Sequence, residues 1–342
     1  MKTIINTICK CFLVCNIIVP IFAQDNSVVK ISGAVFGDYY WVAENHRDDI
    51  KGSNGLWIRR IHLIFDKEFG KAFSARLRFD MASPGDFSTK STLNPIVKDA
   101  YVEWKNDYLQ IILGISPTPA FSVVEKLWKY RNVEKCLEDL QKLTTTRETG
   151  LAIKGKFDSE GIVEYHLMYA NGNGENSESD KGKMLLAAFD FSLSESLVFE
   201  IYANRNYLSV NTEWFTMHGF FGYESENFNL GFQYVYQVRQ SEDTENLNIN
   251  AVSGFGSVKF NDEISILGRF DRMFDPNPQG NSINYLPFYE GTKSTLLIAG
   301  IDYHPTRNLS FIPNIEIVFY DNSSENTAKS DIMPRLTFSY NF

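Results

Sequence analysis

The sequence predicts a transmembrane antiparallel β-barrel of about 16 strands, with one short helix in the third long loop folded toward the lumen. Three observations lead to this fold class. Segments of about ten residues alternate between apolar and polar side chains along most of the chain. The connections between these segments are alternately short and long. The sequence also ends at Phe342, inside one of the alternating segments.

The composition is compatible with a barrel and argues against other classes of protein. The 342 residues are 44% hydrophobic and 14% aromatic, yet the mean hydropathy is −0.23. Abundant aromatic side chains in a chain that is polar on average favour β-structure with an exposed aromatic surface. The net charge is −9 and there is no basic tail, so we expect no nucleic-acid partner.

Residues 1–23 have the features of a secretory signal peptide. Lys2 precedes an apolar stretch, and Ala23 supplies a small residue at its end. We therefore expect cleavage near Ala23, which leaves residues 24–342 as a single barrel domain in a bacterial outer membrane.

Two other interpretations of this N-terminal segment fit the residues less well. A membrane anchor would need a longer uninterrupted apolar run, whereas Lys10 and Pro20 break this one. A lipid-modified Cys15 would need a small residue at the position of Val14. Three of the four cysteines leave with the segment, so the mature chain keeps only Cys136 and has no internal disulfide.

The alternation has a period of two, as in a strand with one apolar and one polar face. At the C-terminus, Leu336, Phe338, Tyr340 and Phe342 share one face, and polar residues share the other. The same pattern recurs in residues 72–81, 99–104, 162–170, 228–236 and 263–272. We count about sixteen such segments, with a range of about 14 to 18, each long enough to cross a bilayer as a tilted strand.

Short and long connections alternate along the chain. "KEFGK", "KND", "DSEG" and "PTRN" are short, whereas "SPGDFSTKSTLNP", residues 117–147, "NGNGENSESDKG" and "RQSEDTENLN" are long and mostly polar. The link near Asn206 is an exception, because a long loop is expected there and the sequence has a short one. Tight turns at one rim and long loops at the other are typical of outer-membrane barrels. A soluble all-β protein, the main alternative, gives no reason for this alternation.

The chain end is consistent with a closed ring of strands. The last strand must pair with the first, because the hydrocarbon core of a bilayer offers no water to the N–H and C=O groups of an unpaired strand edge. A terminal aromatic residue then lies in the interfacial girdle. The segment ending at Phe342 resembles the C-terminal signal of Gram-negative outer-membrane proteins, so we expect the barrel-assembly machinery to be a partner.

Residues 117–147 break the period of two. Apolar residues from Val123 to Leu140 recur at spacings of three and four, which predicts an amphipathic helix. Ser122 is the expected N-cap, with Glu125 three residues later in a capping box. The segment lies between the fifth and sixth strands, in the third long loop.

A lone helix in an outer loop has no surface on which to bury its apolar stripe, so we expect it to fold into the lumen and narrow the channel. The charged residues that it would bring there are Glu125, Lys126, Lys129, Arg131, Glu134 and Lys135. The alternative is a helix on the outer rim, with the same charges in solvent.

Several stretches in residues 55–157 resemble the phosphate-selective porin O and P superfamily. They are "WIRRIHLIFDKEFGKAFSARLRFD", "DAYVEW", "LGISPTPAF", "EKLWKYRNVEK" and "TTTRETGLAIKGKF". The similarity is greatest to a branch with a Pro-x-Pro turn and an E-K-x-W-x-Y-R stretch in the third loop. Beyond residue 157 only the strand rhythm and the closing Phe342 persist. The resemblance implies a sixteen-stranded, usually trimeric barrel in a lipopolysaccharide membrane, with an inward third loop and passive solute diffusion.

In that superfamily, basic residues line the lumen and select anions. The residues of this sequence that match such positions or share inward parity are Arg60, Arg76, Arg78, Asp80, Glu103, Lys154 and Lys156. Arg59 has the parity of the lipid face unless its strand bulges. Inward acids (Asp80, Asp99, Glu103, Glu164, Glu200, Asp271, Asp302 and Glu316) at least balance the bases. We therefore expect at most a weak preference for anions or phosphate, with a transverse field between opposed walls.

The sequence predicts a porin for small hydrophilic solutes or ions. The alternative is a structural or adhesive barrel with a plugged lumen and no transport. We expect no enzymatic activity, cofactor or metal, because the five histidines are scattered, and neither a zinc spacing nor a catalytic signature is present.

Overall fold

The computed structural model describes residues 28–90, 92–209, 211–242, 244–322 and 327–342. The predicted signal peptide and its cleavage point near Ala23 lie outside these residues. The described residues form sixteen strands: β1 (Lys30–Trp41), β2 (Asn54–Phe69), β3 (Phe73–Ala82), β4 (Asn94–Lys105), β5 (Leu109–Pro117), β6 (Arg147–Lys156), β7 (Val163–Ala170), β8 (Lys183–Ser192), β9 (Leu197–Ser209), β10 (Thr212–Glu224), β11 (Phe228–Ser241), β12 (Thr244–Lys259), β13 (Ile264–Met273), β14 (Ser294–Thr306), β15 (Leu309–Tyr320) and β16 (Asp331–Asn341).

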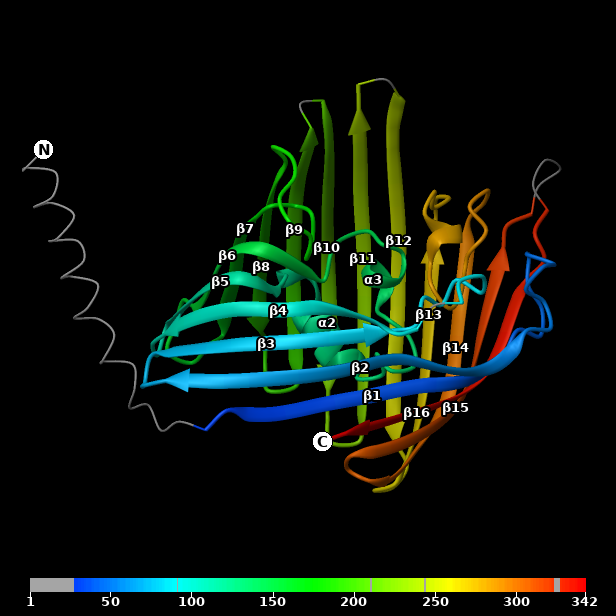
Figure 1. Cartoon of the computed structure of the whole chain (residues 1–342), viewed down its shortest axis with the longest axis horizontal. Helices are drawn as coiled ribbons and strands as arrows, with labels where there is room; N and C mark the ends of the chain where they lie inside the picture. The colour runs from blue at the N-terminus through cyan, green and yellow to red at the C-terminus, as the bar shows by residue number, and fades with distance from the viewer. Residues whose placement is uncertain (1–27, 91, 210, 243, 323–326) are drawn as a thin grey trace, which may run out of the picture.

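The strands close into one antiparallel barrel. Each pairs with its neighbours in sequence, and β16 pairs with β1 in the register Ala34 to Asn341. In Figure 1 the near wall of β1–β4 crosses the far wall of β9–β12 at a steep angle, as expected for the tilted strands of a barrel. The predicted fold class is confirmed. In the part of the chain that the structure describes, no helix is long and apolar enough to cross a membrane.

The chain end completes the ring. Phe342 exchanges two backbone hydrogen bonds with Gly33, at 2.9 and 3.0 Å. A Cβ atom on Gly33 would lie 2.4 Å from Phe342 Cζ, so only glycine lets the terminal ring pack this closely on β1.

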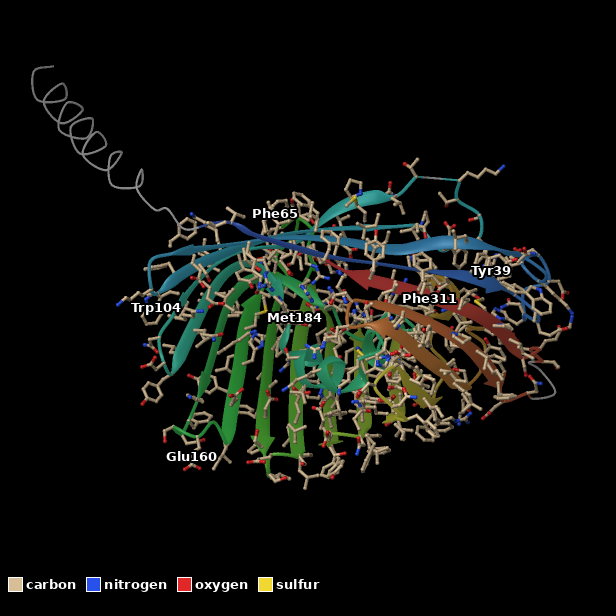
Figure 2. All side chains as sticks on the ribbon, turned by 90° about the horizontal axis from the view of Figure 1, so that it is seen from below. Tyr39, Phe65, Trp104, Glu160, Met184 and Phe311 are labelled. Atoms are coloured by element: carbon tan, nitrogen blue, oxygen red, sulfur yellow. The ribbon has the colours of Figure 1, made fainter. Side chains whose placement is uncertain are left out.

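Side chains alternate between the two faces of the barrel as predicted. On β11, Phe232 and Tyr234 point outward and are 54% and 43% exposed, whereas Gln233 and Gln237 point inward and are almost fully buried. Figure 2 shows Met184 within the barrel and Glu160 at one rim. The outside is therefore apolar and aromatic, and the inside carries most polar groups.

The connections are short at one rim of the barrel and long at the other, as predicted, except for one predicted long loop. The short-turn end holds connections such as Gly70–Ala72, where Gly70 has a φ of 68°. At the long-loop end, the predicted loop "RQSEDTENLN" is wrong, because β11 extends to Ser241 and β12 starts at Thr244. The backbone pairing continues there to Ser241 and Thr244, and the Tyr236 hydroxyl donates to Asn248 Oδ1 across the two strands at 3.2 Å. Together with the short β9–β10 link, this makes β9–β12 project beyond their neighbours (Figure 1).

The third loop (residues 117–147) folds into the lumen, which confirms the predicted direction. It contains a 3₁₀ turn η1 (Pro119–Phe121) and two short helices, α2 (Ser122–Trp128) and α3 (Leu137–Leu140). The predicted helix is interrupted because Lys129 has a φ of 60°, in the left-handed region. The predicted capping box is wrong, since Ser122 is already helical and Phe121 is the N-cap.

A second loop also enters the barrel. The seventh loop (residues 274–293) includes the 3₁₀ turn η2 (Gly280–Ser282) and buries Leu286 and Phe288 to 0% and 2% exposure. The sequence "DPNPQGNSINYLPFYEG" by itself predicts only a long polar loop here. Its apolar run "INYLPFY" is the signal that such a loop needs an interior to pack against.

Candidate solute passage in the lumen

The third loop crosses the lumen from one wall to the other. It leaves the wall at the end of β5. The Trp128 ring lies 5.3 Å from the Phe255 ring on β12, and Asn132 Nδ2 donates to Ser339 Oγ on β16 at 3.0 Å. Since β16 is far from β5 around the ring, the loop divides the interior into a short-turn chamber and a long-loop chamber.

The loop stays in place partly because its apolar face covers an apolar part of the inner wall. Val124, Leu127 and Trp128 are 1–4% exposed and belong to one cluster with inward side chains such as Met168 and Phe220. Burying apolar side chains of this size contributes about 1.5 to 3 kcal/mol each.

Five buried charges fix the middle of the loop to β1, β2, β15 and β16. Arg59 lies 3.3 Å from Asp38 and 3.2 Å from Glu134, and Arg335 lies 3.5 Å from Glu134 and 2.8 Å from Glu316. All five side chains are at most 4% exposed, and we call them the ionic latch. Burial opposes ionisation of Glu134, but Arg59 and Arg335 outweigh it and lower the pKa of that carboxyl.

A second buried contact fixes α3 to the opposite wall. His218 Nδ1 lies 2.7 Å from Glu138 Oε2, and His218 Nε2 lies 3.0 Å from Glu200 Oε1. Gln233 Nε2 also donates to Glu138 Oε2, at 2.9 Å. The third loop is therefore held by polar contacts at both ends of its crossing.

The seventh loop packs on the third loop from the long-loop side. The Arg59 guanidinium lies 4.9 Å from the centre of the Tyr285 ring, and Asn277 Nδ2 donates to Gln141 O at 2.9 Å. Two loops thus narrow the interior, whereas the sequence pattern predicts one.

Partly exposed cations lie on the wall of β2–β6 and on the third loop. Their side chains are 12–24% exposed, unlike the arginines of the latch. We call them the passage cations: Arg60, Arg78, Lys98, Arg131 and Arg147.

The carboxylates that pair with three of these cations lie behind them. Arg60 is 3.1 Å from Asp80, and Arg78 and Arg147 are 3.8 and 2.5 Å from Asp99. The Asp80 and Asp99 side chains are only 3% and 0% exposed. Around Arg60, Arg78 and Arg147 the guanidinium groups are therefore more exposed than their carboxylate partners, whereas Glu125 and Glu175, the partners of Arg131 and Lys98, are 29% and 26% exposed.

Arg131 is the passage cation on the third loop itself. It lies 3.2 Å from Glu125 and 2.6 Å from Asp139. Burial opposes ionisation of Asp139, but Arg131 and Lys135 outweigh it, so the pKa of Asp139 lies well below its usual range. Burial also opposes the charge on Arg131, and Asp139 and Glu125 raise its pKa despite this.

Other predicted lumen residues lie toward the short-turn end. Lys154, Lys156 and Glu164 line a cavity of about 350 Å³ there. Arg76 pairs with Asp66 at 2.7 Å, and both side chains are about one-third exposed. Glu103 has inward parity on β4, opposite Ser74 in the register.

The predicted constriction residues do not act as one group. Arg131 and Glu125 pair with each other, whereas Lys126 faces the short-turn chamber and Lys129 pairs with Glu224 on β10 at 2.6 Å. The side chain of Lys135 is largely buried, which lowers its pKa. The structure does not place Glu134 along the channel: its side chain is 1% exposed, because the ionic latch takes it into the wall.

The inward placement of two cations depends on β-bulges: the sequence predicts an inward Arg59 only if its strand bulges, and it gives Lys98 no place in the lumen. Arg59 and Lys98 each stand where the ladder skips a residue, so they do not follow the parity of their strands. The basic "RR" pair in "WIRRIHL" is a signal for the first of these, and we find no such signal for the second. Within the described residues, no group of three or more His, Cys, Asp or Glu side chains could hold a metal ion.

Comparison with known proteins identifies the fold. No protein-family model matches the chain, and no curated protein is similar to it in sequence. Among solved structures, it is similar to the "Anion-selective porin from Comamonas acidovorans", with a TM-score of 0.67 and 11% identity over 93% of this chain and 100% of that one. It is also similar to Salmonella typhi OmpF in its complex with daunomycin, with a TM-score of 0.65 and 11% identity over 94% and 99% of the two chains.

A third similar structure is OmpT of Vibrio cholerae, with a TM-score of 0.64 and 10% identity over 94% of this chain and 99% of that one. Another structure of that protein is described as a trimer form. At this level of identity the similarity shows that the chain has the closed barrel fold of porins.

Proposed function

We propose that the chain is an outer-membrane porin that allows passive diffusion of small hydrophilic solutes. The passage runs between the third loop and the wall of β2–β6, and it has a weak preference for anions. The observation that carries this proposal is the arrangement of Arg60, Arg78 and Arg147, whose side chains are 14–17% exposed while Asp80 and Asp99 lie behind them at 3% and 0%. In a narrow space, fixed charges at the water-facing surface determine which ions enter.

The similarity to an anion-selective porin supports the same direction of selectivity. Selectivity for phosphate, as in the superfamily that residues 55–157 resemble, is a narrower proposal. Against strong selectivity, all five passage cations are paired with carboxylates, which cancels much of their field at a distance.

Localisation and assembly belong to the same proposal. The apolar outer face supports the outer membrane with its lipopolysaccharide as the environment, reached after signal-peptide cleavage near Ala23. The pairing of Phe342 with Gly33 supports a role of the chain end in assembly by the barrel-assembly machinery. The trimer form of OmpT, a similar outer-membrane protein of Vibrio cholerae, supports a homotrimer.

The test is single-channel recording from purified protein in planar bilayers with a salt gradient. A porin with a weak preference for anions gives stable conductance steps and a reversal potential whose sign shows that anions are more permeant than cations. Deleting residues 122–141 from the third loop should raise the conductance, and unchanged conductance in a correctly inserted variant contradicts its role as constriction.

A plugged structural barrel is the second candidate. The observation that favours it is the contact between the third and seventh loops, with Asn277 bound to Gln141 inside the barrel. It predicts a silent bilayer for the full chain and conductance only after loop deletion.

A further inference from the structure

We propose that the long-loop chamber contains a binding site for a neutral saccharide of one or two rings. The site is a cavity of about 340 Å³ on the long-loop side of the third loop, between its last residues and the ends of β9 and β10. This volume is at the lower end of the range of small-molecule sites, about 300 to 1,000 Å³. The inference goes beyond the proposed function, because it concerns an uncharged ligand and can be tested without any current.

The charged groups around this cavity already have partners. Asp139 pairs with Arg131 at 2.6 Å, Lys142 Nζ donates to Ser282 O at 2.6 Å, and Glu175 pairs with Lys98. Cations therefore compensate Asp139 and Glu175, and an anion at Lys142 would compete with the two contacts that its ammonium makes with Ser282. The chemistry that remains for a ligand is therefore uncharged.

Neutral hydrogen-bonding groups line the cavity from three elements. Thr144 lies on the third loop, Asn204 and Asn206 lie on β9, and Gln279 lies on the seventh loop. Asn204 Nδ2 donates to Thr144 Oγ1 at 3.1 Å, and Asn206 Nδ2 donates to Gly172 O at 3.3 Å. Hydroxyl and amide groups of this kind both donate and accept, so they can exchange hydrogen bonds with ligand hydroxyls without burying a charge.

An aromatic ring completes the site. Trp214 on β10 lines the cavity, and the Arg239 guanidinium lies 4.1 Å from the centre of its ring. The guanidinium fixes the orientation of the indole. A pyranose has an apolar face of C–H groups that packs on an aromatic surface and a rim of hydroxyls that needs amide and hydroxyl partners. A purely apolar ligand would leave the amides without partners.

The site also borders the passage. Asp139 and Glu175, at its edge, are the partners of the passage cations Arg131 and Lys98. A saccharide held there would narrow the route that ions take. Binding should therefore be visible both as heat in solution and as partial interruption of ion current.

The experiment is isothermal titration of the full chain in detergent with maltose, and with inorganic phosphate and uridine as comparators. We expect maltose to bind with an affinity in the millimolar range and the comparators to bind at least about tenfold more weakly. Trp214→Ala should weaken maltose binding by about tenfold, and Trp104→Ala, on the outer face of β4, should leave it within about twofold.

Asn206→Ala provides a second variant that keeps the aromatic ring, with an expected loss of severalfold. Circular dichroism checks that each variant is folded. No heat with maltose, equal binding by Trp214→Ala and the wild type, or tighter binding of uridine or phosphate would each overturn the proposal. In bilayers, maltose added at the long-loop side should cause brief partial closures. If the protein conducts steadily but maltose has no effect, the proposed saccharide site is wrong and the proposed porin function is not affected.

Discussion

Arg59 and Arg60 are adjacent in the sequence, yet both side chains lie inside the barrel. Gly37 pairs with Ile58 and Phe36 pairs with Arg60, so Arg59 is the extra residue of a β-bulge. The bulge lets the two arginines serve different purposes. Arg59 is 3% exposed and holds the third loop, whereas Arg60 is 17% exposed and faces the passage.

This division predicts which arginines control ion selectivity. Replacing Arg60 and Arg78 together by Gln should lower the ratio of chloride to potassium permeability by about threefold, because two water-facing charges are lost. The measurement is the reversal potential in a potassium chloride gradient. Arg205→Gln is the matched control, since Arg205 is on the outer face and pairs with Glu213. An equal shift of the reversal potential in both variants would show that the passage cations do not line the route of the ions.

The latch makes a prediction about stability. Glu134→Gln keeps the shape of the side chain but leaves Arg59 and Arg335 without their shared carboxylate. Breaking a buried pair in this way costs about 3 kcal/mol or more. Thermal unfolding followed by circular dichroism should show a lower midpoint for this variant. The control is Glu224→Gln, whose exposed contact with Lys129 is worth at most about 1 kcal/mol. Equal midpoints for the two variants would contradict the latch.

Cys136 offers a direct report on the position of the third loop. Its thiol is 3% exposed, and burial raises its pKa well above the usual value, so maleimide should label it very slowly in the folded protein. Releasing the loop with Glu134→Gln should speed labelling by about tenfold or more. Denatured protein gives the rate for full access. Fast labelling of the folded wild type would show that the third loop does not stay in the lumen.

The sequence was sufficient for the barrel because lipid contact imposes a period of two on every strand. Tyr340 and Phe338 could be assigned to the outer face from parity alone. Parity fails at Arg59 and Lys98, because a bulge depends on the fit between two strands and not on the residue itself.

The paths of the third and seventh loops could also not be predicted from the periodicity of the sequence. Tyr285 and Leu286 enter the barrel because the third loop leaves an apolar surface for them, which is a tertiary effect. The split of the predicted helix at Lys129 has the same origin: a continuous helix could not both cover β10–β12 and reach β16. Glu134 looked like a channel residue, since periodicity cannot tell a buried ion pair from a solvated charge.

The pair of Asp139 and Arg131 predicts how selectivity responds to acid. The pKa of Asp139 is lowered in the folded protein, because Arg131 and Lys135 outweigh the effect of burial. A lowered folded pKa means that the stabilising contact is present above the unfolded value, about 3.9, and is lost only as the pH falls through the folded value. Asp139 should therefore stay charged between pH 7 and about pH 4.5. Asp139→Asn removes that charge and should shift the reversal potential toward anions, by the same amount at pH 7 and pH 5. If the difference between variant and wild type shrinks toward pH 5, Asp139 is already protonated there, and its contact with Arg131 is weaker than the 2.6 Å separation indicates.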